Sequence, residues 1–255
     1  MFPRRRPKPS PVDPAAFTQG PGVNGGRSRS ATEWPALLRR VERKRRSLDR
    51  DHDGADPNAN LIPSPPDDYY LRATWASFRL EGLDVTEDEL REALGPTSSD
   101  RPTLRSRQAL RLRNHAAILH RIENDLQQGL TLTGDTVLRW YVGISAGLST
   151  TSLDQATQAR LDDVVRRVNS PQLRLQPALQ EVAATHLRLL ADPLVPSFNG
   201  ILARLLLRYH LGRSRLPGVV WDPLADARPR DAATVLRRLV ELLDESFDRV
   251  LRARP

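Results

Sequence analysis

Apolar residues recur at three- and four-residue intervals through most of the chain after residue 66, and no other feature constrains the fold as strongly. This spacing places apolar side chains on one face of an α-helix. Helices are therefore expected in these segments: 67–83, 86–94, 103–128, 133–148, 176–191, 200–212 and 230–252. No βαβ alternation is visible. The pattern predicts an all-α fold with at most a small β-hairpin flap.

Local signals refine these boundaries. Thr86 is followed three residues later by Glu89, which is the pattern of a capping box at a helix N-terminus. Thr133 is a plausible N-cap for the segment that follows it. The β-branched run VVRRV at 164–168 lies between Asp163 and Asn169, and it is predicted to be a short strand.

The composition divides the chain into three parts. Residues 1–32 are rich in Pro, Gly, Ser and Arg without an apolar period, so a disordered basic arm is expected. Residues 33–66 are expected to hold a short basic helix followed by a linker rich in Asp, Asn, Gly and Pro. Residues 67–255 are expected to form the helical domain.

The positive charge is concentrated at the N-terminus. The whole chain has a net charge of +8, but residues 1–50 alone hold 13 basic and 4 acidic residues. Such a segment is suited to a nucleic acid or to an acidic protein surface. The candidate contact residues are Arg4, Arg5, Arg6, Lys8, Arg39, Arg40, Arg43, Lys44, Arg45 and Arg46.

Several classes of protein are disfavoured. The chain contains no cysteine, so neither a disulfide framework nor a zinc site with thiolate ligands is expected, and no metal site is predicted. No apolar run approaches the roughly 20 residues that span a bilayer. The basic N-terminus lacks the apolar stretch of a secretory signal. A soluble cytoplasmic protein without membrane contact is expected.

The stretch PLVPSFNGILARLLL at 193–207 resembles a phosphate-binding loop. A polar bend at Asn199 and Gly200 precedes an apolar helical run that carries Arg204. Backbone N–H groups at a helix N-terminus are well placed to bind an anion. Asn199, Gly200 and Arg204 are therefore the candidate residues of a residual nucleotide or anion site.

Three stretches together resemble the Fic (Fido) family, whose members mostly transfer AMP from ATP to protein hydroxyls. Residues 183–219 resemble its core helix, loop and helix, and 114–141 resemble the helices before it. Residues 76–90 resemble its inhibitory stretch, [S/T]xxxE[G/N], which is matched by Ser77, Glu81 and Gly82. The resemblance covers roughly residues 67–220.

The family's catalytic loop, HxFx[D/E]GNGRxxR, is degenerate here. Aligned on Asn199, Gly200 and Arg204, the other motif positions are occupied by Pro193, Val195, Ser197, Phe198 and Ile201. The base histidine, the acidic Mg²⁺ ligand, a glycine and an arginine are thus all replaced. A general base typically contributes about 10²–10⁴-fold to such a reaction. No catalytic residue is assigned, and His186 is expected to be structural.

The resemblance also implies a contact between Glu81 and Arg204. In the family the corresponding glutamate pairs with the second motif arginine and blocks the ATP γ-phosphate. Here the pair is either a retained inhibitory clasp or an ion pair that fixes the packing of two helices.

The sequence thus predicts a degenerate Fic-like pseudoenzyme, without a cofactor, that binds a protein or a nucleic acid. The alternative is a non-standard Fic-type AMP transferase, which would need ATP and Mg²⁺. Fic proteins often self-associate, so a homodimer is left open.

Overall fold

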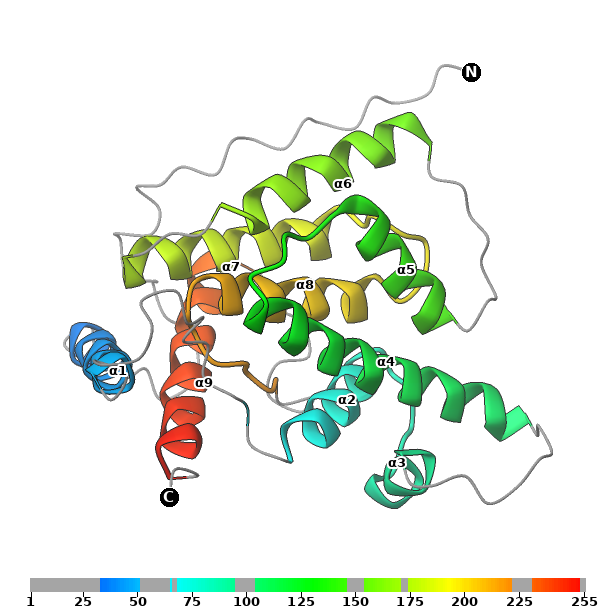
Figure 1. The fold of residues 1–255 in the computed structure, drawn as a ribbon, viewed down its shortest axis with the longest axis horizontal. Helices are drawn as coiled ribbons and strands as arrows, with labels where there is room; N and C mark the ends of the chain where they lie inside the picture. The colour runs from blue at the N-terminus through cyan, green and yellow to red at the C-terminus, as the bar shows by residue number, and fades with distance from the viewer. Residues whose placement is uncertain are drawn as a thin grey trace.

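The computed structural model is built of α-helices, with no strand among the residues it describes, which are 33–50, 65, 68–94, 104–145, 154–170, 174–221 and 231–252 (Figure 1). The predicted disordered arm and residues 51–64 of the predicted linker lie outside these ranges. The helices are α1 (Glu33–Arg50), α2 (Tyr69–Leu80), α3 (Glu87–Leu94), α4 (Leu104–Gln127), α5 (Gly134–Ser145), α6 (Gln155–Val168), α7 (Leu175–Ala191), α8 (Asn199–Arg213) and α9 (Ala232–Arg252). The predicted all-α class is confirmed.

Helix α8 lies at the centre of the arrangement and contacts α2, α4, α5, α6 and α7 (Figure 1). Every residue from Ile201 to Gly212 is buried except Arg204, which is intermediate. The sequence of this helix explains its position, because a helix that is apolar on nearly all sides cannot present a face to water.

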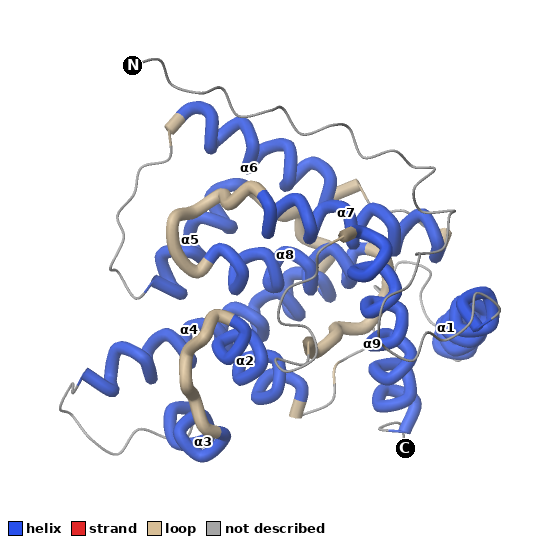
Figure 2. Tube along the Cα trace, turned by 180° about the vertical axis from the view of Figure 1, so that it is seen from behind, coloured by secondary structure: helices blue, strands red, loops and turns tan. Residues whose placement is uncertain are grey.

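Two apolar clusters pack on opposite sides of α8. Helices α2 to α6 supply most of the first cluster, in which Phe78 and Ile122 are fully buried. Helices α1, α7 and α9 supply most of the second, which includes Val41 and Phe247. Tyr209 belongs to the first cluster and Leu211 to the second. Figure 2 shows the division from behind, with α3 and α4 on one side and α1 and α9 on the other.

The predicted helix starts are confirmed, but the predicted strand is wrong. Glu89 N–H donates to Thr86 Oγ1 at 3.2 Å while the Glu89 carboxylate accepts from Thr86 N–H at 2.9 Å, which completes the capping box. Thr133 Oγ1 accepts from Thr136 N–H at the start of α5. Residues 164–168 are the last turns of α6, which Asp154 caps by accepting from Thr157 N–H.

Helix α1 packs along α9 as part of the second cluster. Asp244 of α9 accepts hydrogen bonds from Arg40 Nε at 2.9 Å and from Lys44 Nζ at 2.7 Å. Burial opposes the charged form of Asp244, but these two hydrogen bonds hold its pKa below the usual range. Lys44 also pairs with Asp248. Two of the basic residues predicted to meet a partner therefore anchor α1 to its own chain.

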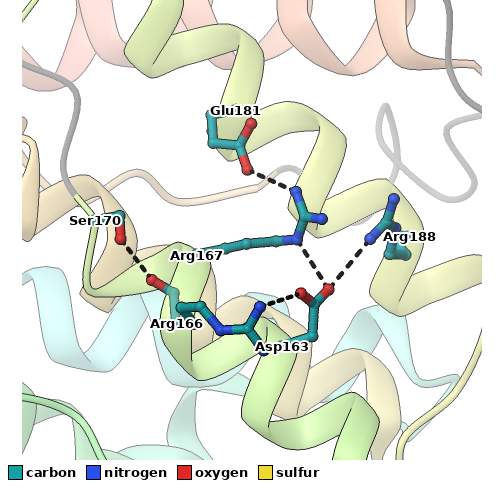
Figure 3. A network of polar contacts seen from close by, with 6 residues as sticks. All are labelled: Asp163, Arg166, Arg167, Ser170, Glu181 and Arg188. Carbon is teal, nitrogen blue, oxygen red and sulfur yellow. Dashed lines mark hydrogen bonds and ion pairs between the residues drawn. The ribbon is translucent and has the colours of Figure 1, made fainter.

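A polar network joins α6 to α7 (Figure 3). Asp163 accepts from Arg167 Nε at 2.9 Å and also pairs with Arg166 and Arg188. Arg167 extends to Glu181 of α7 at 3.3 Å. The hydrogen bond from Arg167 is the main reason why the pKa of Asp163 is lowered. Since these side chains are partly exposed, each pair contributes at most about 1 kcal/mol.

Among the described residues, no helix combines the length and the apolar composition needed to cross a membrane.

Three buried histidines make the fold sensitive to acid. Burial lowers the pKa of His115 to about 3 and those of His186 and His210 to about 4. An unfolded chain binds these protons near pH 6.5, so stability falls as the pH drops from about 6.5 toward 4.

We therefore expect each buried histidine to cost about 2 kcal/mol of unfolding free energy at pH 5 relative to pH 7. The variant His186→Phe keeps a ring stacked on Trp221, which lies 5.5 Å from the His186 ring. Urea unfolding at both pH values should show a loss of stability smaller by about 2 kcal/mol than in the wild type. An identical loss in the two proteins would contradict the assignment.

Candidate functional site

The candidate site begins at the C-terminus of α2, where the backbone positions Glu81. Gly82 has a φ of +77°. Its N–H donates to Arg79 O, and Leu83 N–H donates to Phe78 O. These two bonds form a Schellman motif, in which a glycine at the left-handed position terminates the helix. The sequence signal Glu-Gly thus places a carboxylate directly at the end of α2.

Arg204 of α8 reaches this helix end and binds three of its groups. Nη2 donates to Glu81 Oε1 at 2.9 Å and to the Ser77 carbonyl at 2.7 Å, while Nε donates to Ser77 Oγ at 3.2 Å. Glu81 N–H donates to Phe78 O, and the Ser77 carbonyl in the last turn of α2 accepts from Arg204. Arg204 therefore satisfies a helix terminus as well as a carboxylate.

The carboxylate of Glu81 also lies against the first turn of α8. A Cβ atom on Gly200 would collide with Glu81 Oε1 and would approach Arg204 Nη1 to 3.1 Å. The lack of a side chain at Gly200, and not an unusual backbone angle, therefore lets the Glu81 carboxylate lie this close. The negative carboxylate lies at the positive end of the α8 dipole. An external anion at this place would have to displace Glu81.

The ion pair of Glu81 and Arg204, called the clasp below, is partly buried. The side chain of Arg204 is 11% exposed and that of Glu81 is 24% exposed. Burial lowers the pKa of Arg204, and the adjacent carboxylate of Glu81 opposes this shift. The structure thus brings together all the residues predicted for the inhibitory-type motif, Ser77, Glu81 and Gly82, with Gly200 and Arg204.

The Asn199 side chain is used within the loop. Its Oδ1 accepts from Leu194 N–H at 2.9 Å, and its Nδ2 donates to Leu189 O at 2.7 Å. These bonds join the end of α7 to the start of α8 across the loop. Of the three residues expected to bind an anion, Asn199 thus uses its side chain to bond the backbone of Leu189 and Leu194.

Phe198 adopts a conformation that favours glycine. Its φ is 57° and its ψ is 20°, in the left-handed region, and it occupies the N-cap position of α8. For a bulky residue this is a genuine outlier. The ring lies against the guanidinium of Arg111, with Arg111 Cζ 4.8 Å from the ring centroid. The backbone therefore has the turn of a glycine although the residue carries a bulky side chain.

The other loop positions that differ from the family motif also make contacts within the fold. The Pro193 carbonyl accepts from Arg160 Nη2 at 3.2 Å. Ser197 Oγ lies 3.4 Å from the Tyr141 hydroxyl. Val195 and Ile201 are buried in the first apolar cluster. None of these side chains brings a carboxylate or an imidazole to the start of α8.

His186 does not replace the missing base. It is buried between α7 and α8, and its Nδ1 lies 3.4 Å from Ala203 O. Its ring stacks on that of Trp221. Within the described ranges, no group of three or more His, Cys, Asp or Glu residues could hold a metal ion.

The predicted basic surface is only partly described. Arg4, Arg5, Arg6 and Lys8 lie outside the described residues. On α1, Arg39 and Arg43 are exposed, Arg46 pairs with Glu42, and Arg45 is buried.

The sequence-based predictions did not include one buried ion pair. Arg208, one helical turn after Arg204, binds Glu123 of α4 through two hydrogen bonds, of which Nε to Oε1 measures 2.6 Å. Their side chains are 2% and 5% exposed. An arginine in the middle of an apolar run is the signal that predicts such a pair, because a buried charge requires a partner.

The strain at Phe198 can be measured with two truncations. Phe198→Ala and Phe198→Gly lose the same ring contacts, but only glycine is free of the left-handed penalty of about 1–2 kcal/mol. We expect Phe198→Gly to be more stable than Phe198→Ala by about that amount in urea unfolding. The same pair of substitutions at Asp192, whose φ is −126°, should not favour glycine. Equal stabilities at position 198 would show that the turn relaxes.

Solved structures with the same arrangement of helices are Fic domain proteins. Fic-1 from C. elegans has a TM-score of 0.65 at 16% identity, with 89% of this chain and 75% of that chain covered. A variant of Fic-1 with one glutamate-to-glycine change has a TM-score of 0.64 at 15% identity, with coverage of 88% and 73%.

A Fic domain containing signaling protein from Bacteroides thetaiotaomicron has a TM-score of 0.62 at 18% identity, with coverage of 85% and 97%. No protein-family model and no curated protein matches the sequence. The central buried α8, the loop before it and the helix end held by Arg204 are thus parts of a chain that has the fold of Fic domain proteins.

Proposed function

We propose that this chain is a catalytically degenerate Fic-fold protein that works by binding a partner. The observation that supports this proposal is the position of Glu81. Its carboxylate lies against Gly200 at the start of α8 and is held by Arg204 at 2.9 Å. The place where an anionic phosphate would bind a helix N-terminus is taken by a group of the chain itself.

The surrounding residues do not fit ATP with Mg²⁺. Magnesium usually requires at least one carboxylate in addition to phosphate oxygens, and Ser197 supplies only a hydroxyl near Tyr141. Pro193 has no titratable group and cannot accept a proton from an attacking hydroxyl. Phe198 places a ring at the turn that precedes α8. We therefore derive no transfer step through a nucleotide.

One observation favours the alternative, a non-standard AMP transferase. The contact between Glu81 and Arg204 has the form expected of a self-inhibitory clasp, and the Glu81 side chain is 24% exposed. A rotation of this side chain would open the start of α8. Such an enzyme would still need a base that the described loop residues do not provide.

Two substitutions distinguish the proposals. Glu81→Ala removes the carboxylate, whereas Gly200→Ala displaces it without removing the charge. Because Arg204 loses a partner in both, we expect Glu81→Ala to cost about 1–3 kcal/mol of unfolding free energy, and Gly200→Ala to cost less. The pseudoenzyme proposal predicts no Mg²⁺-dependent ATP binding by calorimetry and no labelled AMP on any protein in either variant.

Glu92→Ala, on the exposed side of α3, is the matched control for loss of a carboxylate. It should leave both stability and nucleotide binding unchanged. Mg²⁺-dependent ATP binding or AMP transfer by Glu81→Ala would establish the transferase alternative instead.

We also propose that basic residues of α1 and of the N-terminal arm contact the partner. Because Arg40 and Lys44 are engaged with Asp244, the contribution of α1 is limited mainly to Arg39 and Arg43. The arm adds Arg4, Arg5, Arg6 and Lys8. A nucleic acid is the partner most readily tested, since neutralised phosphates give an affinity that falls with salt.

The test is a full-length variant in which those four arm residues are replaced by glutamine. If the arm contacts duplex DNA, the variant should bind DNA more weakly than the wild type. The magnitude of the slope of log K against log salt should also fall, by about 0.9 for each lost phosphate contact. Arg121→Gln, at an exposed position of α4, is the control. Unchanged DNA binding would exclude the arm as a DNA contact. An absence of DNA binding by the wild type would favour an acidic protein partner.

A further inference from the structure

A small pocket adjoins the contact between Glu81 and Arg204, and it is lined by Ser77 and Arg204 but by no residue of the loop before α8. It is lined by residues of α2, α4 and α8 and by the segment from Val219 to Trp221. Its volume is about 20 Å³. A cavity needs about 10–15 Å³ to hold one water molecule, so a single water-sized occupant fits and a nucleotide does not.

Three side chains that line the pocket each leave a buried nitrogen without a hydrogen-bond partner in the described part of the chain. These atoms are His115 Nε2, Arg208 Nη1 and Trp221 Nε1. The residues are 1%, 2% and 6% exposed. Buried polar atoms are almost always hydrogen-bonded, so three such atoms around one small pocket indicate an occupant.

The hydrogen-bonding character of these atoms favours an acceptor. Trp Nε1–H and the Arg guanidinium can only donate. His115 Nδ1 lies 2.9 Å from Thr74 Oγ1, and a Thr74 hydroxyl that donates to Nδ1 leaves the ring proton on Nε2. All three groups are then donors without a partner among the residues that line the pocket. A water molecule there would have no unpartnered acceptor among these three for its own protons.

The charged residues around the pocket also favour an anion. Arg204 and Arg208 both line it, whereas their partners Glu81 and Glu123 do not. Arg204 adds to the effect of burial in lowering the pKa of His115. The lining therefore includes both arginines and neither carboxylate, so the pocket favours negative charge.

We propose that this pocket is a binding site for one monatomic anion, of the size and charge of chloride or bromide. Trp221 Nε1 and Arg208 Nη1 donate to it, and His115 Nε2 completes the site. A pocket volume of about 20 Å³ suits an ion of that size. The site shares Ser77 and Arg204 with the candidate site but includes no residue of the loop before α8, so the proposal does not depend on whether that loop binds nucleotide.

A bound halide stabilises the folded chain because the unfolded chain has no such site. Thermal unfolding in sodium chloride or bromide should therefore show a rise in midpoint that saturates, compared with sodium gluconate at equal ionic strength. Trp221→Phe keeps an aromatic ring beside His186 and removes the N–H donor together with part of the indole ring. We expect it to weaken halide affinity about tenfold or more, as for loss of one hydrogen bond to a charged group.

Trp140→Phe is the matched control, because Trp140 is buried in the first apolar cluster and does not line the pocket. It should retain the halide dependence. The line width of chloride NMR with the wild-type chain provides a readout that needs no variant, and binding should broaden it.

Equal stabilisation by gluconate and halide would overturn the proposal. So would halide dependence retained in Trp221→Phe, or an unbroadened chloride line. Equal stabilisation or an unbroadened line would mean that the pocket holds water only, and halide dependence retained in Trp221→Phe would mean that the halide binds elsewhere on the chain.

Discussion

Two arginines lie one turn apart in the most buried helix, and each needs a carboxylate because an unpaired charge in the interior is strongly unfavourable. Arg204 pairs with Glu81 at the end of α2, and Arg208 pairs with Glu123 in α4. These contacts set the positions of α2 and α4 on α8, and apolar packing completes the arrangement. The clasp at the candidate site is thus one of two similar pairs along α8.

The loop before α8 is held by backbone contacts that do not depend on the side chains at 193, 195 and 197. Asn199 still closes the loop through Leu189 and Leu194, and Phe198 still has a positive φ that a glycine would adopt at less cost. The hydrogen bonds of Asn199 thus hold the backbone of the loop, and they do not involve the side chains at 193, 195 and 197. This is why a chain with proline at 193 and serine at 197 can retain the fold of Fic domain proteins at 15–18% identity.

Most helices were predictable because their apolar spacing and their caps agree, as at Thr86 and Thr133. The strand at 164–168 was predicted wrongly because β-branched residues outweighed a helical pattern. Leu161, Val164 and Val168 lie on one buried face of α6, and Asp154 caps its start far from the run itself. The contact of Glu81 with Arg204 was predicted from a resemblance, whereas their 123-residue separation gives no local signal.

The sequence by itself determined the helical class, the central burial of α8 and the absence of a titratable side chain at 193, since these depend on residue type and local spacing. Only the tertiary structure decided what the charged groups do. Arg40 and Lys44 were expected to meet a partner, but they bind Asp244, about 200 residues away in the chain. The pocket beside His115, Arg208 and Trp221 likewise joins distant segments. Electrostatic and hydrogen-bonding partners are chosen by proximity in space, which local sequence patterns do not contain.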